Sequence, residues 1–264
     1  MPNINEDLGA MPRKLLPIIY VIDTSGSMKG DRIAAVNEAM RDTLEVLRDV
    51  SANNPSAELK VGVLTFATSA EWITKSGLIY LDDYYWNDLE AGGLTDLGAA
   101  LTELDKKLSR NAFLTSEVGF KAPVIIFMSD GAPTDDWEVT LIKTFSSNKW
   151  FKVATKIALA VGDLADMNVL SRIVARPDGT PNPEAVIPVT DMDTLRKLIR
   201  VVSVTASQVG STSRTEDDVQ DQILERLKRQ TEDPTKKRDS RPADSKDGSS
   251  SDTGDDWGDF WDEW

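Results

Sequence analysis

Hydrophobic residues in the first 206 positions form short runs that alternate with segments of helical periodicity. In these segments apolar residues recur every three or four positions, as they do after Asp31, a predicted helix cap, and after Thr95. The alternation, with its short connections, predicts an α/β fold: a doubly wound, mainly parallel sheet with helices on both faces. The predicted strands are 15–22, 58–66, 71–74, 122–128, 152–160 and 185–189.

Acidic residues mark the starts of the later helices. Asp135 and Asp136 are predicted to cap a helix that reaches about Ser147. Asp166 is predicted to begin another helix, and Asp191 a last one that ends at about Ala206. The folded domain is therefore expected to span residues 12–206, after a flexible N-terminus of residues 1–11.

The pattern changes after residue 206. Residues 207–214 are small and polar and predict a linker, and residues 215–230 predict an amphipathic helix with a narrow apolar stripe. That stripe either packs on the chain's own domain or docks on a partner. Residues 231–254 are rich in Ser, Asp, Lys, Arg and Pro, and their composition predicts disorder.

Residues 255–264 combine acidic residues with four large aromatics, Trp257, Phe260, Trp261 and Trp264. Their spacing of i, i+3, i+4 and i+7 places them on one face of a short helix, which predicts a partner-binding motif that docks in a groove. Gly258 weakens the helical form, so an extended docking mode stays open. The alternative interpretation is an acidic tail that only solubilises the protein.

Composition narrows the classes of function. The 264 residues carry a formal net charge of −14, which disfavours binding to nucleic acid or an anionic membrane surface. Histidine and cysteine are absent, which excludes a Ser-His-Asp triad, a cysteine nucleophile, a zinc finger and a disulfide framework. The first 12 residues do not resemble a secretory signal, and no stretch of about 18 apolar residues occurs, so a cytoplasmic protein is expected.

Oxygen-bearing side chains follow two of the predicted strands and one glycine-rich loop. The run 18–22 ends in Asp-x-Ser-x-Ser, Gly92-Gly93 precede Thr95, and the run 124–128 is followed by an aspartate. In open α/β sheets ligands bind beyond the carboxyl ends of the strands, and oxygen-only donors suit a hard cation. Mg²⁺ is favoured, and Ca²⁺ and Mn²⁺ also fit. The candidate metal ligands are Asp23, Ser25, Ser27, Thr95 and Asp130.

In this order and placement, these residues resemble the metal-ion-dependent adhesion site of von Willebrand factor A domains, and the resemblance covers about residues 12–206. It implies that Ser25 and Ser27 ligate the metal directly and that the aspartates often act through water. It also implies an open position for an Asp or Glu of a protein partner, and an antiparallel edge strand at Trp72.

The segments 15–28, 33–38 and 127–135 further resemble the bacterial TerY type, which is associated with tellurite resistance. That resemblance implies a cytoplasmic adaptor of a signalling or stress-defence module, with a Ser/Thr kinase and a PP2C-type phosphatase as partners. The cysteine-rich tail of some TerY proteins has no counterpart here, because the chain lacks cysteine.

No catalytic residues are expected, and two alternatives to the adaptor stay open. Phosphatases of the haloacid-dehalogenase type need Asp-x-Asp, whereas Ser25 stands at the third position, and no P-loop is present. The first alternative is a partner of an AAA-type ATPase chaperone. The second is a self-assembling or autoinhibited module whose own acidic tail occupies the metal site.

Overall fold

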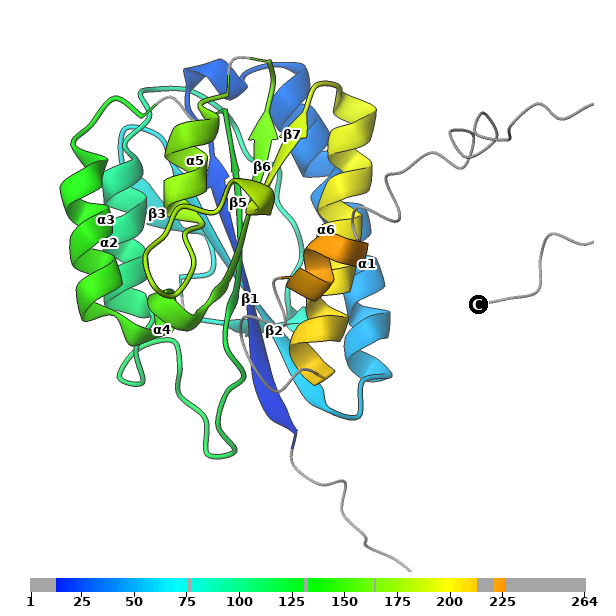
Figure 1. Cartoon of the computed structure of the whole chain (residues 1–264). Helices are drawn as coiled ribbons and strands as arrows, with labels where there is room; N and C mark the ends of the chain where they lie inside the picture. The colour runs from blue at the N-terminus through cyan, green and yellow to red at the C-terminus, as the bar shows by residue number, and fades with distance from the viewer. Residues whose placement is uncertain (1–12, 76, 131–132, 164, 213–220, 227–264) are drawn as a thin grey trace, which may run out of the picture. The chain divides into compact units, whose positions relative to one another are not determined.

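In the part of the chain that the structure describes, seven strands form one sheet in which five strands run parallel, with helices on both faces (Figure 1). The computed structural model describes residues 13–75, 77–130, 133–163, 165–212 and 221–226. The spatial order is β3-β2-β1-β5-β6-β7, and β4 also pairs with β2. The strands are β1 (Lys14–Asp23), β2 (Ala57–Phe66), β3 (Ala70–Trp72), β4 (Ile79–Tyr80), β5 (Val124–Ser129), β6 (Thr155–Val161) and β7 (Val186–Val189).

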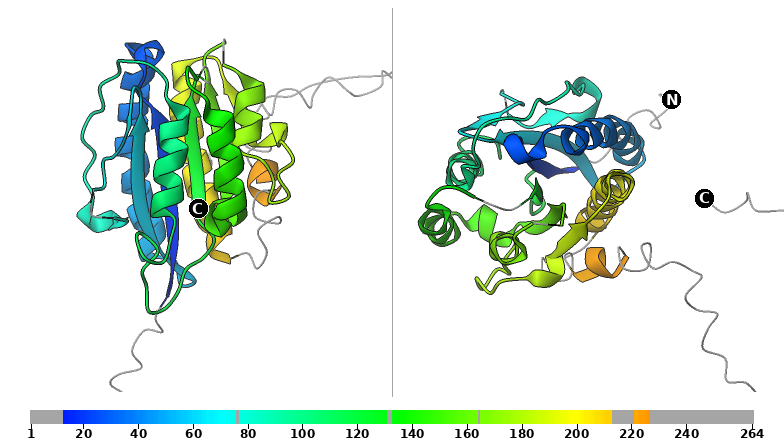
Figure 2. Two further views of the ribbon diagram at one scale, coloured as in Figure 1. Left: turned by 90° about the vertical axis from the view of Figure 1, so that its left-hand side faces the viewer. Right: turned by 90° about the horizontal axis from the view of Figure 1, so that it is seen from above.

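Two layers of helices enclose the sheet. The pair α1 and α6 covers one face, and α2, α3 and α5 lie over the other, as the views in Figures 1 and 2 agree. Within the described ranges the α-helices are α1 (Asp31–Ala52), α2 (Leu97–Lys107), α3 (Trp137–Ser147), α4 (Lys149–Val153), α5 (Met167–Ile173) and α6 (Met192–Thr212). Short 3-10 turns are η1 (Gly26–Met28), η2 (Leu81–Asp83) and η3 (Pro183–Ala185). The predicted fold class is confirmed.

The central strand β1 is buried at every position after Lys14. Helices on both faces exclude water from it, which is why its sequence is almost continuously hydrophobic rather than alternating. β1 pairs in parallel with β2 on one side and with β5 on the other. Ile22 lies opposite Met128 of β5, so the carboxyl ends of β1 and β5 meet at one edge of the sheet.

Trp72 lies in β3, an antiparallel edge strand, as the family resemblance implied. Two other local predictions were wrong. The strand predicted over 152–160 begins at Thr155, because the Asn148 side chain accepts bonds from the Trp150 and Phe151 N–H groups and starts the helix α4 there. Asp31, the predicted cap of the first helix, is instead the first residue of α1, and Gly30 occupies the N-cap position. Gly30 has a φ of 80°, which glycine adopts without strain.

Helix α6 is longer than predicted, because it continues through residues 207–212, which were assigned to a linker. The small residues there are packed rather than exposed: Ser207 and Ser211 are buried, and a Cβ on Gly210 would lie 3.3 Å from the Leu16 Cδ2 atom of β1. The Ser207 and Ser211 hydroxyls donate to carbonyls of α6 itself. A small, polar composition here therefore permits close helix–sheet packing rather than chain flexibility.

The segment predicted as an amphipathic helix over 215–230 is described only at residues 221–226, which are helical. Ile223 and Leu224 are buried in the hydrophobic core, so this part packs on its own domain. The N-terminal residues 1–11, the linker 231–254 and the motif 255–264 lie outside the described residues, and their boundaries stay predictions. Within the described residues no helix is long and apolar enough to cross a lipid bilayer.

A buried hydrogen bond joins α6 to the central strand. The Tyr20 hydroxyl of β1 donates to the Ser203 Oγ atom at 2.8 Å, and the Ser203 hydroxyl donates to the Ile199 carbonyl at 2.6 Å. Complete burial raises the pKa of Tyr20 well above its ordinary value. The phenol therefore stays a neutral hydrogen-bond donor. This bond helps to set the position of α6 along β1.

We predict that Ser203→Ala destabilises the protein more than Tyr20→Phe does. Tyr20→Phe removes one bond and leaves Ser203 bonded to Ile199, at a cost of about 1 kcal/mol, whereas Ser203→Ala leaves a buried phenol unpaired, at about 1–3 kcal/mol. Urea unfolding of both variants and of the double variant measures the difference. Equal losses of unfolding free energy would contradict this order.

Candidate metal centre

Asp23 ends β1 inside the protein and is completely buried. Its Oδ1 atom accepts the Ser25 N–H at 2.8 Å, and its Oδ2 atom accepts the Ser129 hydroxyl at 2.7 Å. Burial raises the pKa of Asp23; the bonds from Ser25 and Ser129 oppose that rise, and the charge of Asp130 adds to it. Because β1 pairs in parallel with β5, Asp23 ends the strand next to the one that precedes Asp130.

The two candidate serines lie on the tight turn between β1 and α1. Ser25 is buried and precedes the turn η1, whereas Ser27 is exposed within it. Their Oγ atoms are 3.0 Å apart, and buried Met28 anchors the end of the turn in the core. The arrangement brings two neutral hydroxyl oxygens together, with one of them open to solvent.

Backbone hydrogen bonds attach the Thr95 loop to this turn. The Gly92 N–H donates to the Thr24 carbonyl at 2.7 Å, and the Gly26 N–H donates to the Gly93 carbonyl at 3.0 Å. Gly93 has a φ of 88°, and a Cβ on it would lie 2.5 Å from the Thr68 hydroxyl, so only glycine fits. The loop thus carries Thr95, which is buried, to the carboxyl edge of the sheet.

Asp130 follows β5 at the same edge and is nearly buried. Its Oδ2 atom accepts a bond from the Arg32 Nη1 atom at 3.2 Å. Its Oδ1 atom is buried and has no hydrogen-bond partner among the described residues. A buried, unpaired carboxylate oxygen is costly, and a cation bound there would satisfy it.

All five predicted ligands therefore lie at one edge of the sheet, Asp23 at the end of β1 and the other four in the adjoining turn and loops. Within the described residues no group of three His, Cys, Asp or Glu side chains could hold a metal ion. The donor set has two carboxylates, and the remaining predicted donors are hydroxyls. Two buried carboxylates, one with an unpaired oxygen, beside clustered hydroxyls fit a hard, oxygen-preferring cation.

Other acids near the site act as helix caps. Asp96 accepts the Ala99 N–H and caps α2. Asp135 also serves α2, because its carboxylate accepts the Leu97 and Gly98 N–H groups. Burial, and to a lesser degree neighbouring Asp96, raises the pKa of Asp135. Asp136 occupies the predicted N-cap position of α3, but its side chain makes no capping hydrogen bond to that helix.

Sequence reasoning missed two residues of the site. Ser129 donates to Asp23 and is the last residue of the buried strand β5, so a small polar residue before the aspartate was an available signal. Arg32 pairs with Asp130 from the first turn of α1, and nothing in its spacing marked it. The predicted motif Trp257, Phe260, Trp261 and Trp264 lies outside the described residues.

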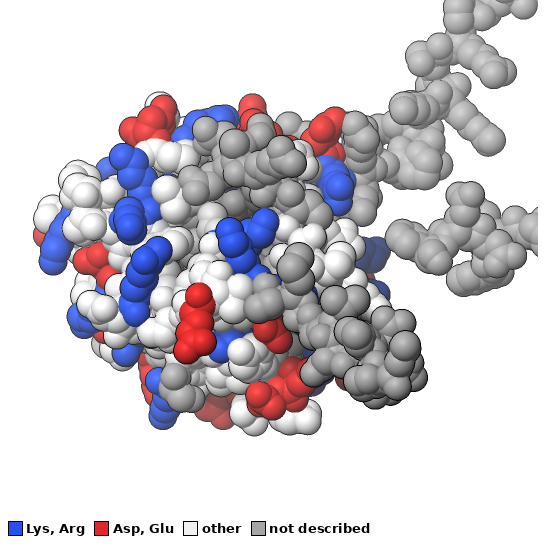
Figure 3. Space-filling model, turned by 90° about the horizontal axis from the view of Figure 1, so that it is seen from below, with Lys and Arg blue, Asp and Glu red and all other residues white. Residues whose placement is uncertain are grey.

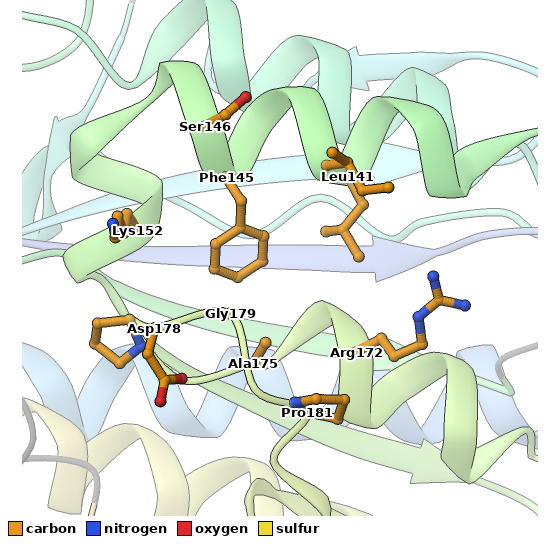
Figure 4. A pocket seen from close by; sticks show the side chains of 11 residues that line it. Leu141, Phe145, Ser146, Lys152, Arg172, Ala175, Asp178, Gly179 and Pro181 are labelled. Atoms are coloured by element: carbon orange, nitrogen blue, oxygen red, sulfur yellow. The ribbon is translucent and has the colours of Figure 1, made fainter.

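A separate groove of about 310 Å³ lies between α3, α4, α5 and the loop that follows α5 (Figure 4). Leu141 and Phe145 line its apolar part, and Lys152 and Arg172 also lie along it. None of the predicted metal ligands lines this groove. On the end of the molecule opposite the carboxyl edge, the coloured basic and acidic side chains are interspersed and form no field of one sign (Figure 3).

Residues 18–132 match the family model of the von Willebrand factor type A domain. No curated protein sequence matches the chain. Among solved structures, proximal thread matrix protein 1 from the mussel byssus is 19% identical, with a TM-score of 0.51, over 74% of this chain and 47% of that protein. A further structure of the mussel protein is described as having a zinc-occupied MIDAS motif, the metal-ion-dependent adhesion site.

Two microbial structures are similar at the level of fold. The ArnB paralog VWA2 from Sulfolobus acidocaldarius is 18% identical, with a TM-score of 0.50, over 70% of this chain and 44% of that one. The pilus adhesin SpaC from Lactobacillus rhamnosus GG is 15% identical, with a TM-score of 0.53, over 81% of this chain and 31% of that one.

This chain spans less than half the length of each of these three proteins. At such low identity they show a shared fold. The chain thus matches the von Willebrand factor type A domain over residues 18–132, and these solved structures share its fold.

Proposed function

We propose that the chain is a metal-dependent protein-interaction module and not an enzyme. In this proposal Asp23, Ser25, Ser27, Thr95 and Asp130 hold a divalent cation, to which a partner adds an Asp or Glu carboxylate. The observation that carries the proposal is the unpaired, buried Oδ1 atom of Asp130 at the same edge as buried Asp23. A cation would satisfy both carboxylates at once.

The charges of the donor set favour an outside carboxylate. Two carboxylates balance a divalent cation, but Arg32 already offsets part of the charge of Asp130. The hydroxyls contribute oxygen atoms without negative charge. A bound cation therefore keeps a net attraction for an anion, and exposed Ser27 leaves one side of the site open to a partner.

The choice of metal follows from the chemistry of the donors. The mussel protein is described with zinc in its site. In this chain all the proposed donors are oxygen atoms, and oxygen donors suit Mg²⁺, Mn²⁺ or Ca²⁺ better than zinc, which commonly takes nitrogen or sulfur ligands. We therefore propose Mg²⁺ as the resident ion, with Mn²⁺ as a convenient probe.

The resemblance of three segments to the TerY type supports a role in a bacterial phosphorylation-linked signalling or stress-defence module. The proposed partners are a Ser/Thr kinase and a PP2C-type phosphatase, and this role would place the protein in the cytoplasm. The motif at Trp257, Phe260, Trp261 and Trp264 would be a second docking element. Two linked contacts would raise affinity by about 100-fold or more if the linker spans both sites.

Asp23→Asn should weaken Mn²⁺ binding by about 100-fold or more, because it removes one of the two negative charges that hold the ion. Ser27→Ala should weaken binding by about 10-fold, since it removes one neutral oxygen. Isothermal titration calorimetry of the full-length variants measures both effects, and circular dichroism checks that each variant is folded.

Ser146→Ala is the matched control for Ser27→Ala, because Ser146 is an exposed serine on α3 whose hydroxyl donates to the Lys143 carbonyl of its own helix. Its Mn²⁺ affinity should equal that of the wild type. If Asp23→Asn bound Mn²⁺ as tightly as the wild type does, the ion would have to lie elsewhere.

Affinity capture from native lysate, in Mg²⁺ and again in EDTA, tests the partner. We expect a kinase or phosphatase that is recovered in Mg²⁺ and lost in EDTA or with Asp23→Asn. A partner that persists in EDTA but is lost when residues 255–264 are removed would move recognition to the aromatic motif. Recovery of an AAA-type ATPase instead would favour the chaperone-partner alternative.

A further inference from the structure

Arg32 bonds to two members of the proposed metal site at once. Its Nη1 atom lies 3.2 Å from the Asp130 Oδ2 atom and 3.1 Å from the Ser27 carbonyl oxygen. The Asp130 side chain in this ion pair is only 10% exposed, and the Arg32 side chain 31%. The guanidinium therefore contacts a largely buried carboxylate of the proposed site while it stays partly open to solvent.

The fold also leaves space for this guanidinium at the end of β6. Gly162 has a φ of 92°, and a Cβ on it would lie 2.5 Å from the Arg32 Nη2 atom and 3.0 Å from the Cζ atom. The guanidinium is therefore bounded by the turn after β1, by the end of β5 and by the end of β6. Three separate segments converge on it, so its position is set by the tertiary structure.

We propose that Arg32 is an internal cation that competes with the divalent ion for the Asp130 carboxylate. The inference rests on the proposed metal site. A divalent ion that binds Asp130 must share this carboxylate with the guanidinium or displace it. At a separation of about 6 Å in a water-like dielectric, repulsion between charges of +1 and +2 weakens binding by about tenfold.

This competition links the metal to the partner. A carboxylate that arrives at the metal carries negative charge to the space beside the guanidinium and so relieves the repulsion between the two cations. Arginine also binds carboxylates with parallel hydrogen bonds. Metal and partner therefore bind more tightly together than separately, and Arg32 keeps the affinity for metal alone low.

The test compares Mn²⁺ affinities of the full chain by titration calorimetry at low ionic strength. Arg32→Gln should bind Mn²⁺ about tenfold more tightly than the wild type, because the competing charge is gone. Arg32→Lys keeps the charge and should stay within about threefold of the wild type. Arg41→Gln is the matched control, because Arg41 lies on the same helix and pairs with exposed Asp88; its affinity should not change.

Salt dependence gives a second readout that a purely structural role would not produce. The advantage of Arg32→Gln should shrink as ionic strength rises from about 0.01 M to about 1 M, because the screening length falls from about 30 Å to about 3 Å. Circular dichroism in EDTA checks that the variant is folded.

Unchanged Mn²⁺ binding by Arg32→Gln would overturn the proposal, because Arg32 would then not compete with the metal. Weaker binding would also overturn it, because Arg32 would then hold Asp130 in position for the metal. Failure of the proposed function looks different. In that case neither the wild type nor Arg32→Gln binds Mn²⁺. Alternatively, both bind Mn²⁺, and introducing Asp23→Asn into either protein leaves the affinity unchanged. Both proposals would be supported if Arg32→Gln bound Mn²⁺ more tightly than the wild type and the further substitution Asp23→Asn abolished that binding.

Discussion

The structure of the candidate site depends on the parallel pairing of β1 with β5. That pairing brings two carboxylates of like charge, Asp23 and Asp130, to one buried edge of the sheet. Like charges held in a low-dielectric interior are costly unless they are compensated. Asp23 is compensated by the Ser25 N–H and the Ser129 hydroxyl, whereas among the described residues Asp130 has a partner, Arg32, for only one of its oxygens.

The surrounding structure holds this arrangement in place. Backbone hydrogen bonds join the turn after β1 to the Gly92–Gly93 loop, and Asp135 binds the first N–H groups of α2 beside that loop. On the other face, α6 is fixed to β1 through Tyr20 and Ser203. Donors that rest on strand ends and bonded loops keep their geometry better than donors on free loops, as a binding site requires.

Much of the fold and of the candidate site could be predicted from the sequence, because the sequence patterns that indicate them are local. A hydrophobic run that ends in Asp-x-Ser-x-Ser marks both a buried strand and its carboxyl end, so the sheet and the place of Asp23 followed together. The rest depends on tertiary contacts. The C-terminal part of α6 has a linker-like composition but is helical, and Gly210 lets it pack closely against Leu16 of β1.

Arg32 illustrates the same limit within the site. Its role is created by Asp130, which is 98 positions away, and by the space that Gly162 leaves at the end of another strand. No pattern on its own helix distinguishes it from Arg41, which pairs with a surface aspartate. Such long-range pairs appear only when the fold is known.

The most direct test of the central claim is a crystal structure of the full chain grown with Mn²⁺, with an anomalous difference map to locate the ion. The account predicts a strong peak at the carboxyl edge of the sheet, bounded by the five proposed ligands Asp23, Ser25, Ser27, Thr95 and Asp130. A map with no peak there at saturating Mn²⁺, or with the ion bound at another surface, would contradict it.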